Sequence, residues 1–260
     1  MLTNSIAATD AGIRAASSFL DVTANNVANS DTPGYKTSQV TFQDLLYTGP
    51  RAGAFVQGVT TPTGSQIGTG VIVDSITGRF TQGGLQASSG AFDLAITGEG
   101  FFPVTLTDGT NGYTRAGNFV TDSAGQLVTP QGYLLAGGIT VPPNTDSISV
   151  SADGTVTAFS ADGGTQVIGQ LSLTRFTNPG GLSRFGDNVF TVTPATGAAV
   201  TDAPGASGLG TVTQGFLELS NVDLPTELVN LIIAQQSFRF NTQALQVESD
   251  VLQATTDLIR

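Results

Sequence analysis

The sequence contains no cysteine, no histidine and no tryptophan, and Lys36 is its only lysine. Without imidazole or thiol groups the chain cannot build a histidine general base, a thiolate nucleophile or a zinc site of the usual nitrogen and sulfur ligands. A phosphate-binding loop requires a lysine directly after glycine, whereas Lys36 follows Tyr35. We therefore expect neither a cofactor nor a bound metal ion.

Basic residues and long apolar runs are also scarce. The chain has 9 basic and 20 acidic side chains, which gives a net charge of −11 at pH 7. Because nucleic-acid phosphates are bound by clustered Lys and Arg, we expect no nucleic-acid partner. No apolar run is long enough to cross a membrane, so we expect no membrane insertion. The N-terminal segment carries Asp10 and Arg14 and lacks the apolar stretch of a cleavable signal peptide, so an exported protein would need another route.

Glycine, in contrast, is abundant, with 33 residues, and only 11% of the chain is charged. This composition is typical of many short strands joined by tight turns. Alternating apolar runs predict strands at 71–73, 94–96, 101–106, 148–150, 171–173 and 189–192. Dipeptides that favour hairpin turns predict turns at Asp108-Gly109, Asn111-Gly112, Asp153-Gly154 and Asp162-Gly163.

The N-terminal segment has helical periodicity from Leu2 to about Asn29. Apolar residues recur every seven residues and form a stripe along this helix. The second position of the same repeat is small or polar, with Thr9, Ala16 and Thr23, so the stripe is narrow and needs a partner. The segment Asn29 to Gly34 should end this helix, because its polar side chains, Pro33 and Gly34 favour a turn. The stripe repeats every seven residues and consists of Ile6, Ile13, Leu20 and Val27.

A second helix is predicted from Leu224 to Arg260, with Pro225 in its first turn and Glu227 near its positive N-terminus. A helix of this size would be about 50 Å long, more than a small domain covers. We therefore expect the two terminal helices to form a coiled-coil-like domain, and two ordinary amphipathic helices packed on a sheet remain the alternative. The second stripe consists of Leu231, Phe238, Leu245, Leu252 and Ile259.

The predicted fold is a mixture of α and β structure in three parts. Residues 1–36 and 220–260 form the helical domain, and residues 71–219 form a central all-β domain rich in hairpins. Residues 37–70 form a linker and an extended segment. The stretch from Tyr47 to Gly70 has no clear period, so it is either a flexible loop or an arm that orders against a neighbour.

Catalytic chemistry has little support in the remaining residue types. Asp93 and Glu99 are imaginable as a glycosidase-like acid pair, but a glycine-rich turn with one exposed acid explains Glu99 better. Arg115 either pairs with one of the many acids or binds a neighbouring subunit. The Asp-Gly loops at 122–125 and 153–154 lack the ligand pattern of an EF-hand. We expect no catalytic, cofactor-binding or metal-binding residue.

Several motifs together resemble the bacterial flagellar rod and hook protein family. The run Ala24 to Asn29 followed by Thr32 to Lys36 is similar to its N-terminal signature, and the run from Gln214 to Asn241 is similar to its C-terminal part. Further similarity lies at 98–102, 113–119 and 125–132. The signature residues are Asn25, Asn26, Asn29, Pro33, Gly34, Tyr35, Gly98, Gly100, Phe101, Phe102, Asn221, Gln235 and Asn241.

Within the family, the flanks Asp44 to Tyr47 and Gln66 to Val71 resemble those of the extended insertion in distal rod members. The resemblance implies a non-enzymatic subunit of a rigid helical tube that transmits motor torque to the hook. In the family, the terminal helices form the inner layer of the tube and the β domain forms the outer layer. The two apolar stripes would then be the assembly surfaces.

The resemblance also implies location and partners. The subunit would lie in the periplasm-spanning rod of the flagellar basal body, after type III export without a cleavable signal peptide. Its partners would be copies of itself, other flagellar rod and hook proteins, and the ring proteins that surround the rod. The alternatives are a proximal rod or hook paralogue and, from a different class, an extracellular β-domain binding module on a dimerising helical stalk.

Overall fold

The structure is a computed structural model that describes residues 2–51, 55–56, 59–60, 65–160 and 163–258. It divides into two units. The helical unit contains Met1–Val27, Ser38–Thr77 and Asp223–Arg260, and the β-rich unit contains Ala28–Thr37 and Gly78–Val222. The predicted mixture of terminal helices and a central strand-rich region is confirmed. The division differs from the predicted boundaries, because 28–37 belongs to the β-rich unit and 71–77 to the helical unit.

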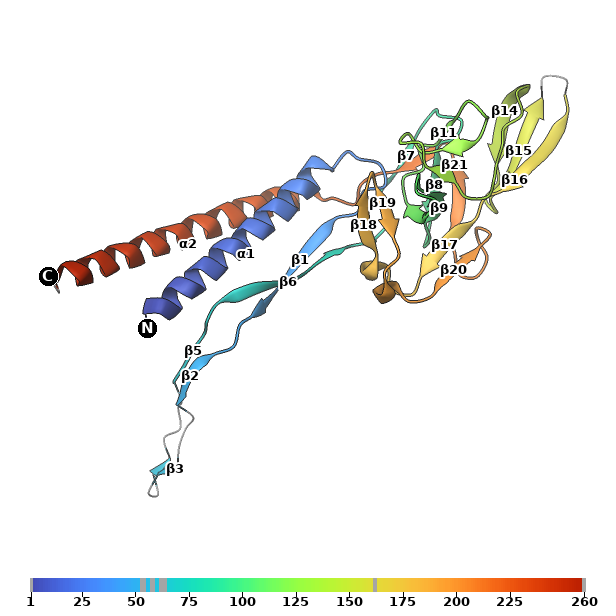
Figure 1. Cartoon of the computed structure of the whole chain (residues 1–260). Helices are drawn as coiled ribbons and strands as arrows, with labels where there is room; N and C mark the ends of the chain where they lie inside the picture. The colour runs from blue at the N-terminus through green and yellow to red at the C-terminus, as the bar shows by residue number, and fades with distance from the viewer. Residues whose placement is uncertain (1, 52–54, 57–58, 61–64, 161–162, 259–260) are drawn as a thin grey trace. The chain divides into compact units, whose positions relative to one another are not determined.

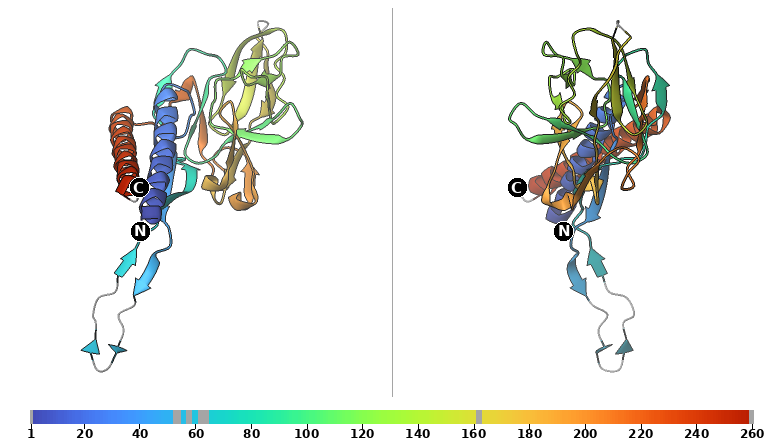
Figure 2. Two further views of the ribbon diagram at one scale, coloured as in Figure 1. Left: turned by 60° about the vertical axis from the view of Figure 1, so that its left-hand side comes forward. Right: turned by 90° about the vertical axis from the view of Figure 1, so that its right-hand side faces the viewer.

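Two long helices form the core of the helical unit, α1 (Leu2–Ala28) and α2 (Leu224–Leu258). They lie side by side and antiparallel, with both chain ends at the same end of the pair (Figures 1 and 2). α2 begins where predicted, with Glu227 in its first turn. The Asp223 backbone carbonyl accepts the Glu227 N–H in the first turn, and the Asp223 carboxylate accepts the Thr226 hydroxyl.

A long hairpin completes the helical unit. β1 (Ser38–Asp44) pairs with β6 (Val71–Gly78), and the same ribbon continues into β2 (Thr48–Arg51) and β5 (Ser65–Ile67) (Figure 1). β3 (Phe55–Val56) and β4 (Val59–Thr60) form a further antiparallel pair. We call residues 48–67 the arm. The described residues of this stretch form paired strands, and its ordering against a neighbour stays a prediction.

The ribbon lies close to α1. The backbone of Gly70 has φ +116°, and a Cβ there would lie 3.0 Å from the Ala11 Cβ and 3.1 Å from the Ala8 Cα. The rings of Phe19 and Phe42 meet edge to face with centroids 6.2 Å apart. Small residues on α1 and a glycine on the hairpin therefore allow a close approach.

The β-rich unit is built from short antiparallel strands. Its largest sheet has seven strands in the order β11-β12-β13-β9-β10-β19-β18, next to a three-stranded sheet β14-β15-β16 and the pairs β17-β20, β21-β8 and β22-β7. The strands are β7 (Leu85–Ala87), β8 (Leu94–Thr97), β9 (Phe102–Thr105), β10 (Asn111–Thr114), β11 (Val120–Thr121), β12 (Leu127–Val128), β13 (Leu134–Leu135), β14 (Thr145–Val150), β15 (Thr155–Ser160), β16 (Thr165–Gln170), β17 (Leu173–Phe176), β18 (Ser183–Gly186), β19 (Val189–Thr191), β20 (Ala199–Asp202), β21 (Thr211–Gln214) and β22 (Phe216–Glu218).

Three of the four predicted turns can be compared with the structure. Asp108-Gly109 joins β9 to β10, and Asp153-Gly154 joins β14 to β15. The prediction for Asn111-Gly112 is wrong, because both residues lie in β10 and pair with β9. A Cβ at Gly112 would lie 2.5 Å from the Val189 Cγ1, so this glycine serves close cross-strand packing rather than a turn. Asp162 lies outside the described residues.

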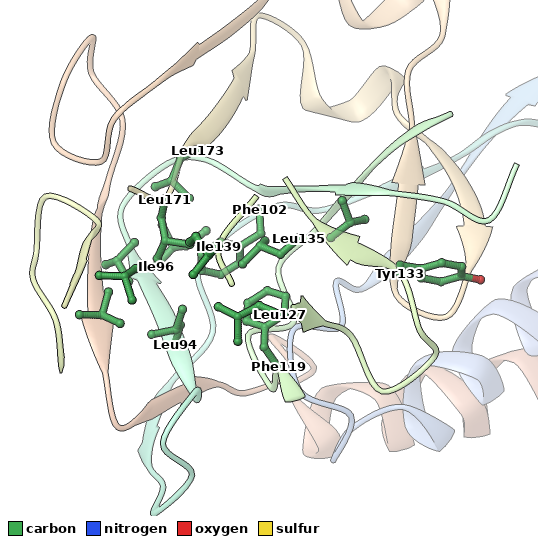
Figure 3. Packing of buried hydrophobic residues seen from close by; sticks show 14 of the residues in the cluster. Leu94, Ile96, Phe102, Phe119, Leu127, Tyr133, Leu135, Ile139, Leu171 and Leu173 are labelled. Carbon is green, nitrogen blue, oxygen red and sulfur yellow. The ribbon is translucent and has the colours of Figure 1, made fainter. Parts of the chain in front are cut away.

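Apolar side chains from these strands converge on one core. Leu94 and Ile96 of β8, Phe102 of β9 and Leu173 of β17 are each at most 1% exposed. Figure 3 shows these side chains in one cluster with Phe119, Leu127 and Leu135. A second cluster of aromatic rings lies beside it, with predominantly edge-to-face contacts. Its members are Phe80, Phe101, Tyr113, Phe176, Leu182 and Phe190.

Candidate functional site: a buried ionic anchor and an exposed helical face

The signature segment 28–37 is held against the β-rich unit by its backbone. Gly34 adopts φ +71° and donates its N–H to the carbonyl of Glu218 at 2.7 Å. The Pro33 carbonyl accepts a hydrogen bond from Asn188 Nδ2 at 2.8 Å. A left-handed glycine is required at this turn, and a Cβ on Gly34 would lie only 2.5 Å from the backbone nitrogen of Ala116.

The next residue of the segment, Lys36, is completely buried. Its ammonium group donates to the Thr81 carbonyl at 2.8 Å and to the Glu218 carboxylate, which is itself 1% exposed. Arg115 lies on the other side of that carboxylate, with Nη1 3.2 Å from Glu218 Oε2. The backbone N–H of Gly83 also donates to Glu218 Oε1 at 3.0 Å. We call Lys36, Arg115 and Glu218 the ionic anchor.

The charges of the ionic anchor do not balance, because two cations surround one carboxylate. Burial lowers the pKa of Lys36 and of Arg115, and the nearby Glu218 carboxylate opposes both shifts. Arg115 disperses its charge further by donating to the carbonyls of Gly98 at 2.6 Å and Ile96 at 3.4 Å. Glu218 is therefore the centre on which both buried cations depend.

Asn221 joins the ends of the connecting segments. Its Oδ1 accepts from the Thr37 N–H at 2.8 Å and the Thr37 hydroxyl at 2.7 Å. Its Nδ2 donates to the carbonyls of Arg79 at 2.9 Å and Thr81 at 3.1 Å. One amide side chain thus connects three segments that are distant in sequence. The position requires a side chain that both accepts and donates hydrogen bonds, which explains the signature asparagine.

A stacked arginine covers the anchor. The Arg184 guanidinium lies 5.2 Å from the centroid of the Tyr35 ring and 5.5 Å from that of Phe190. It also donates to the Lys36 carbonyl. Tyr35 is 4% exposed, so the signature tyrosine acts as a buried platform for a cation.

The remaining signature residues of the β-rich unit have packing roles. Gly98 and Gly100 adopt φ +110° and +136°, and the Gly98 carbonyl accepts the Arg115 hydrogen bond. Phe101 belongs to the aromatic cluster, and Phe102 is fully buried in the main core. Asn29 accepts a hydrogen bond from the Thr32 hydroxyl at 3.2 Å within the turn that follows α1.

In the helical unit, Asn26 performs a similar connecting role. It is 1% exposed, and its side chain makes two 2.9 Å hydrogen bonds with the backbone of Ser38 at the start of β1. The same Nδ2 lies 3.3 Å from Glu227 Oε1 on α2. The neighbouring signature residues Asn25 and Gln235 are exposed on their helices.

The most deeply buried positions on the two helices are occupied by small and polar residues. Thr9, Ala16 and Thr23 of α1 are at most 9% exposed, and Ala234 of α2 is fully buried. Opposite them, the position of a Cβ on Gly12 would lie 2.8 Å from Asn241 Oδ1. The predicted stripe of α1 is only half-buried; it consists of Ile6, Ile13, Leu20 and Val27.

Large apolar side chains on α2 are exposed instead. Of the predicted stripe, Leu231 is half-buried, Phe238, Leu245 and Leu252 are 36–38% exposed, and Ile259 lies outside the described residues. Several neighbours that the heptad pattern did not include are more exposed. These residues are Leu228, Val229, Ile232, Ile233, Phe240, Val247 and Val251, with exposed fractions from 44% to 67%. We call these and the stripe residues the apolar face of α2.

Asp93 and Glu99, which the sequence analysis considered as an acid pair, have separate partners among the described residues. Asp93 accepts a hydrogen bond from the Ser88 hydroxyl, whereas Glu99 is highly exposed and lies 3.5 Å from Arg175 Nη1. Among the described residues, no cluster of acidic side chains has the arrangement of a metal site. Neither helix, over its described length, is apolar enough to span a bilayer.

The sequence analysis left two roles open for Arg115, pairing with an acid or binding a neighbouring subunit, and it assigned no role to the side chains of Lys36 and Glu218. Arg115 is 4% exposed and belongs to the ionic anchor, so pairing with an acid is the alternative that the structure supports. One signal was available, because a single lysine in a chain of 260 residues stands inside a signature motif. Its partners lie 79 and 182 residues further along the chain, as the residue numbers show.

Three family models match this chain. The model of the flagella basal body rod protein matches residues 12–36, that of the flagellar hook protein FlgE/F/G D1 domain matches 95–158, and that of the flagellar basal body rod FlgEFG protein C-terminal region matches 213–258. These ranges contain Lys36, Arg115 and Glu218. The chain therefore belongs to the flagellar basal-body rod and hook protein family.

Curated relatives identify the branch of the family. The flagellar basal-body rod protein FlgG of Caulobacter vibrioides is 42% identical over 252 residues, covering 95% of this chain and 96% of the relative. FlgG of Bacillus subtilis is 38% identical, covering 93% of each chain. FlgF of Caulobacter vibrioides is 35% identical and covers 84% of this chain and 82% of the relative. The protein is a structural subunit of the flagellar basal-body rod, similar over nearly its full length to FlgG proteins.

The charge imbalance of the ionic anchor predicts an order of effects. Glu218→Gln leaves two buried cations without an anion and should lower the free energy of unfolding by about 3–5 kcal/mol. Lys36→Met keeps the pair between Arg115 and Glu218 and should cost less, about 1–3 kcal/mol. Urea titrations of the unassembled full chain, followed by tyrosine fluorescence, measure both. The control is Glu99→Gln, in the exposed ion pair with Arg175, which should leave the urea midpoint of unfolding unchanged. Equal losses of unfolding free energy in Glu218→Gln and Lys36→Met would refute this account.

Gly34 and Gly109 form a matched pair, because both have left-handed backbones with φ +71° and +82°. A Cβ on Gly109 would meet no atom within 4 Å, whereas one on Gly34 would meet backbone atoms at 2.5–2.7 Å. Gly109→Ala should therefore cost about 1–2 kcal/mol for the backbone conformation alone. Gly34→Ala should cost about 1–3 kcal/mol more because of the clash. The same titrations measure both, and similar costs would contradict the close approach.

Proposed function

We propose that this chain is a subunit of the distal rod that assembles into a rigid helical tube and transmits motor torque to the hook. In this proposal the terminal helices form the inner layer as coiled-coil-like neighbours, and the β-rich unit forms the outer layer. The tube spans the periplasm within the basal body. The subunit acts by packing and carries out no catalysis.

The observation that carries this proposal is the apolar face of α2. Seven of its side chains are between 44% and 67% exposed, namely Leu228, Val229, Ile232, Ile233, Phe240, Val247 and Val251. So many large apolar side chains exposed along one helix indicate an interaction site, because leaving them in water is unfavourable. A helix of 35 residues is about 50 Å long, so other copies are needed to cover it.

A helical tube follows from contacts between unlike surfaces. If the apolar face of α2 meets a different surface of the next copy, such as the half-buried stripe of α1, the contact is heterologous. Such a contact adds subunits without closing on itself and generates a filament. The other rod and hook proteins and the surrounding ring proteins would then meet this tube at its ends and on its outer surface.

The arm provides a second link between copies. Its described strands form an antiparallel ribbon that continues β1 and β6. A ribbon that reaches a neighbouring copy would oppose the sliding of subunits along each other. We infer that the arm makes the rod stiff where a hook bends.

Removal of an exposed apolar side chain should separate assembly from folding. Ile232 is 57% exposed, so Ile232→Glu should change the free energy of unfolding by less than about 0.5 kcal/mol. The same change should raise the critical concentration for tube formation by about tenfold or more, because the interface between copies would bury the new carboxylate. Sedimentation and electron micrographs measure assembly. Gln243→Glu, an exposed polar position on α2, is the control, and tubes at the normal concentration from Ile232→Glu would contradict the proposal.

Deletion of residues 48–67 tests the arm. The remaining β1–β6 ribbon should still form, because its pairing lies outside the deleted part. Tubes of the shortened chain should bend visibly in electron micrographs, with a shorter persistence length than the full-length tubes. Tubes that stay as straight as the original would show that stiffness has another source.

A further inference from the structure

The β-rich unit contains a cavity that the proposed function leaves unused. It has a volume of about 370 Å³ and is walled by the aromatic rings of Phe80, Phe101 and Phe176. Arg115 also lines it, and the exposed ion pair of Glu99 and Arg175 belongs to the same lining. An apolar wall with cationic groups fits an apolar side chain that is accompanied by a carboxylate. We call it the phenylalanine pocket.

Arg115 has spare capacity for such a ligand. The residue is 4% exposed, and its Nε has no hydrogen-bond partner among the described residues. A buried guanidinium N–H without an acceptor is costly, and it marks a place where a partner group is expected. The ionic anchor has one more cation than it has carboxylates, and the exposed Glu99 in the pocket lining also acts on Arg115, so the site favours negative charge.

The complementary chemistry lies on the same chain, at the base of the arm. Leu46 is 88% exposed and Tyr47 is 55% exposed, and Asp44 is exposed two residues before Leu46. In an extended segment, residues two apart lie on the same face, so Asp44 and Leu46 are presented together. We call residues 44–47 the arm base.

The backbone of the arm base is fixed, although its side chains are exposed. The Leu45 N–H donates to the Gly70 carbonyl at 2.9 Å, and the Thr69 hydroxyl donates to the Leu46 carbonyl at 2.7 Å. Exposed apolar anchors on an ordered backbone bind at a low entropic cost. They are typical of interface hot spots.

We propose that the phenylalanine pocket of one copy receives the arm base of a second copy. Leu46 and Tyr47 enter between the phenylalanine rings, and the Asp44 carboxylate pairs with Arg175 and draws on the positive charge of Arg115. The inference rests on the proposed function, because it requires copies of this chain to be neighbours. The inference adds to the proposed function which two surfaces of neighbouring copies meet.

Cysteine crosslinking tests the contact against a clean background, since the chain has no cysteine. Leu46→Cys and Thr177→Cys, an exposed residue lining the pocket, are prepared as separate full-length variants. One is labelled with nitrogen-15, and the two are mixed at high concentration and oxidised. A disulfide-linked heterodimer identified by mass is the expected result. Leu46→Cys mixed with Thr165→Cys, exposed on β16 and outside the pocket, is the control and should form little heterodimer.

A charge exchange tests the polar part of the contact. Arg175→Glu in the Thr177→Cys variant should reduce the heterodimer yield about tenfold, and Asp44→Arg in the Leu46→Cys variant should restore it. Absence of the heterodimer would overturn the inference. Heterodimer yields that change with neither Arg175→Glu nor Asp44→Arg would also overturn it. Micrographs of the same concentrated wild-type protein decide the proposed function separately. Missing tubes overturn the rod assignment, whereas tubes without the crosslink overturn only the pocket contact.

Discussion

The structure depends on the buried contact between Lys36 and the carboxylate of Glu218. The chain crosses between the helical unit and the β-rich unit four times, at 27–28, 37–38, 77–78 and 222–223. The segments beside these crossings meet around this contact, through the Gly34–Glu218 hydrogen bond and through Asn221, which binds Thr37, Arg79 and Thr81. This hydrogen-bonded cluster therefore holds together the ends of the β-rich segments that continue into α1, β1, β6 and α2.

The two helices divide their surfaces between folding and assembly. Thr9, Ala16 and Thr23 of α1 and Ala234 of α2 are buried, so the deeply buried positions of the helices carry little apolar surface. The large apolar side chains, such as Ile232 and Phe240, stay outside. In the proposed rod, these side chains would make apolar contacts with neighbouring copies.

Sequence reasoning succeeded where the signal was local. The seven-residue period of the helices and the Asp-Gly turns follow from the geometry of one element, so α1, α2 and the turns at Gly109 and Gly154 were predictable. Asn111-Gly112 failed, because the close approach of Val189 from β19 is a tertiary effect. The ionic anchor was missed for the same reason: its three residues meet only after the β-rich unit has folded. The stripes were found, but which residues face inward depended on the small side chains opposite them.

The ionic anchor also limits how this protein can change over generations. Lys36 and Arg115 share the desolvated carboxylate of Glu218, so replacing Glu218 leaves two buried cations unpaired, and replacing either cation removes one of the partners of that carboxylate. A lineage cannot pass easily through such single-substitution intermediates. The three positions should therefore be inherited as a set, and a homologue that has lost one of them should carry a compensating residue at another.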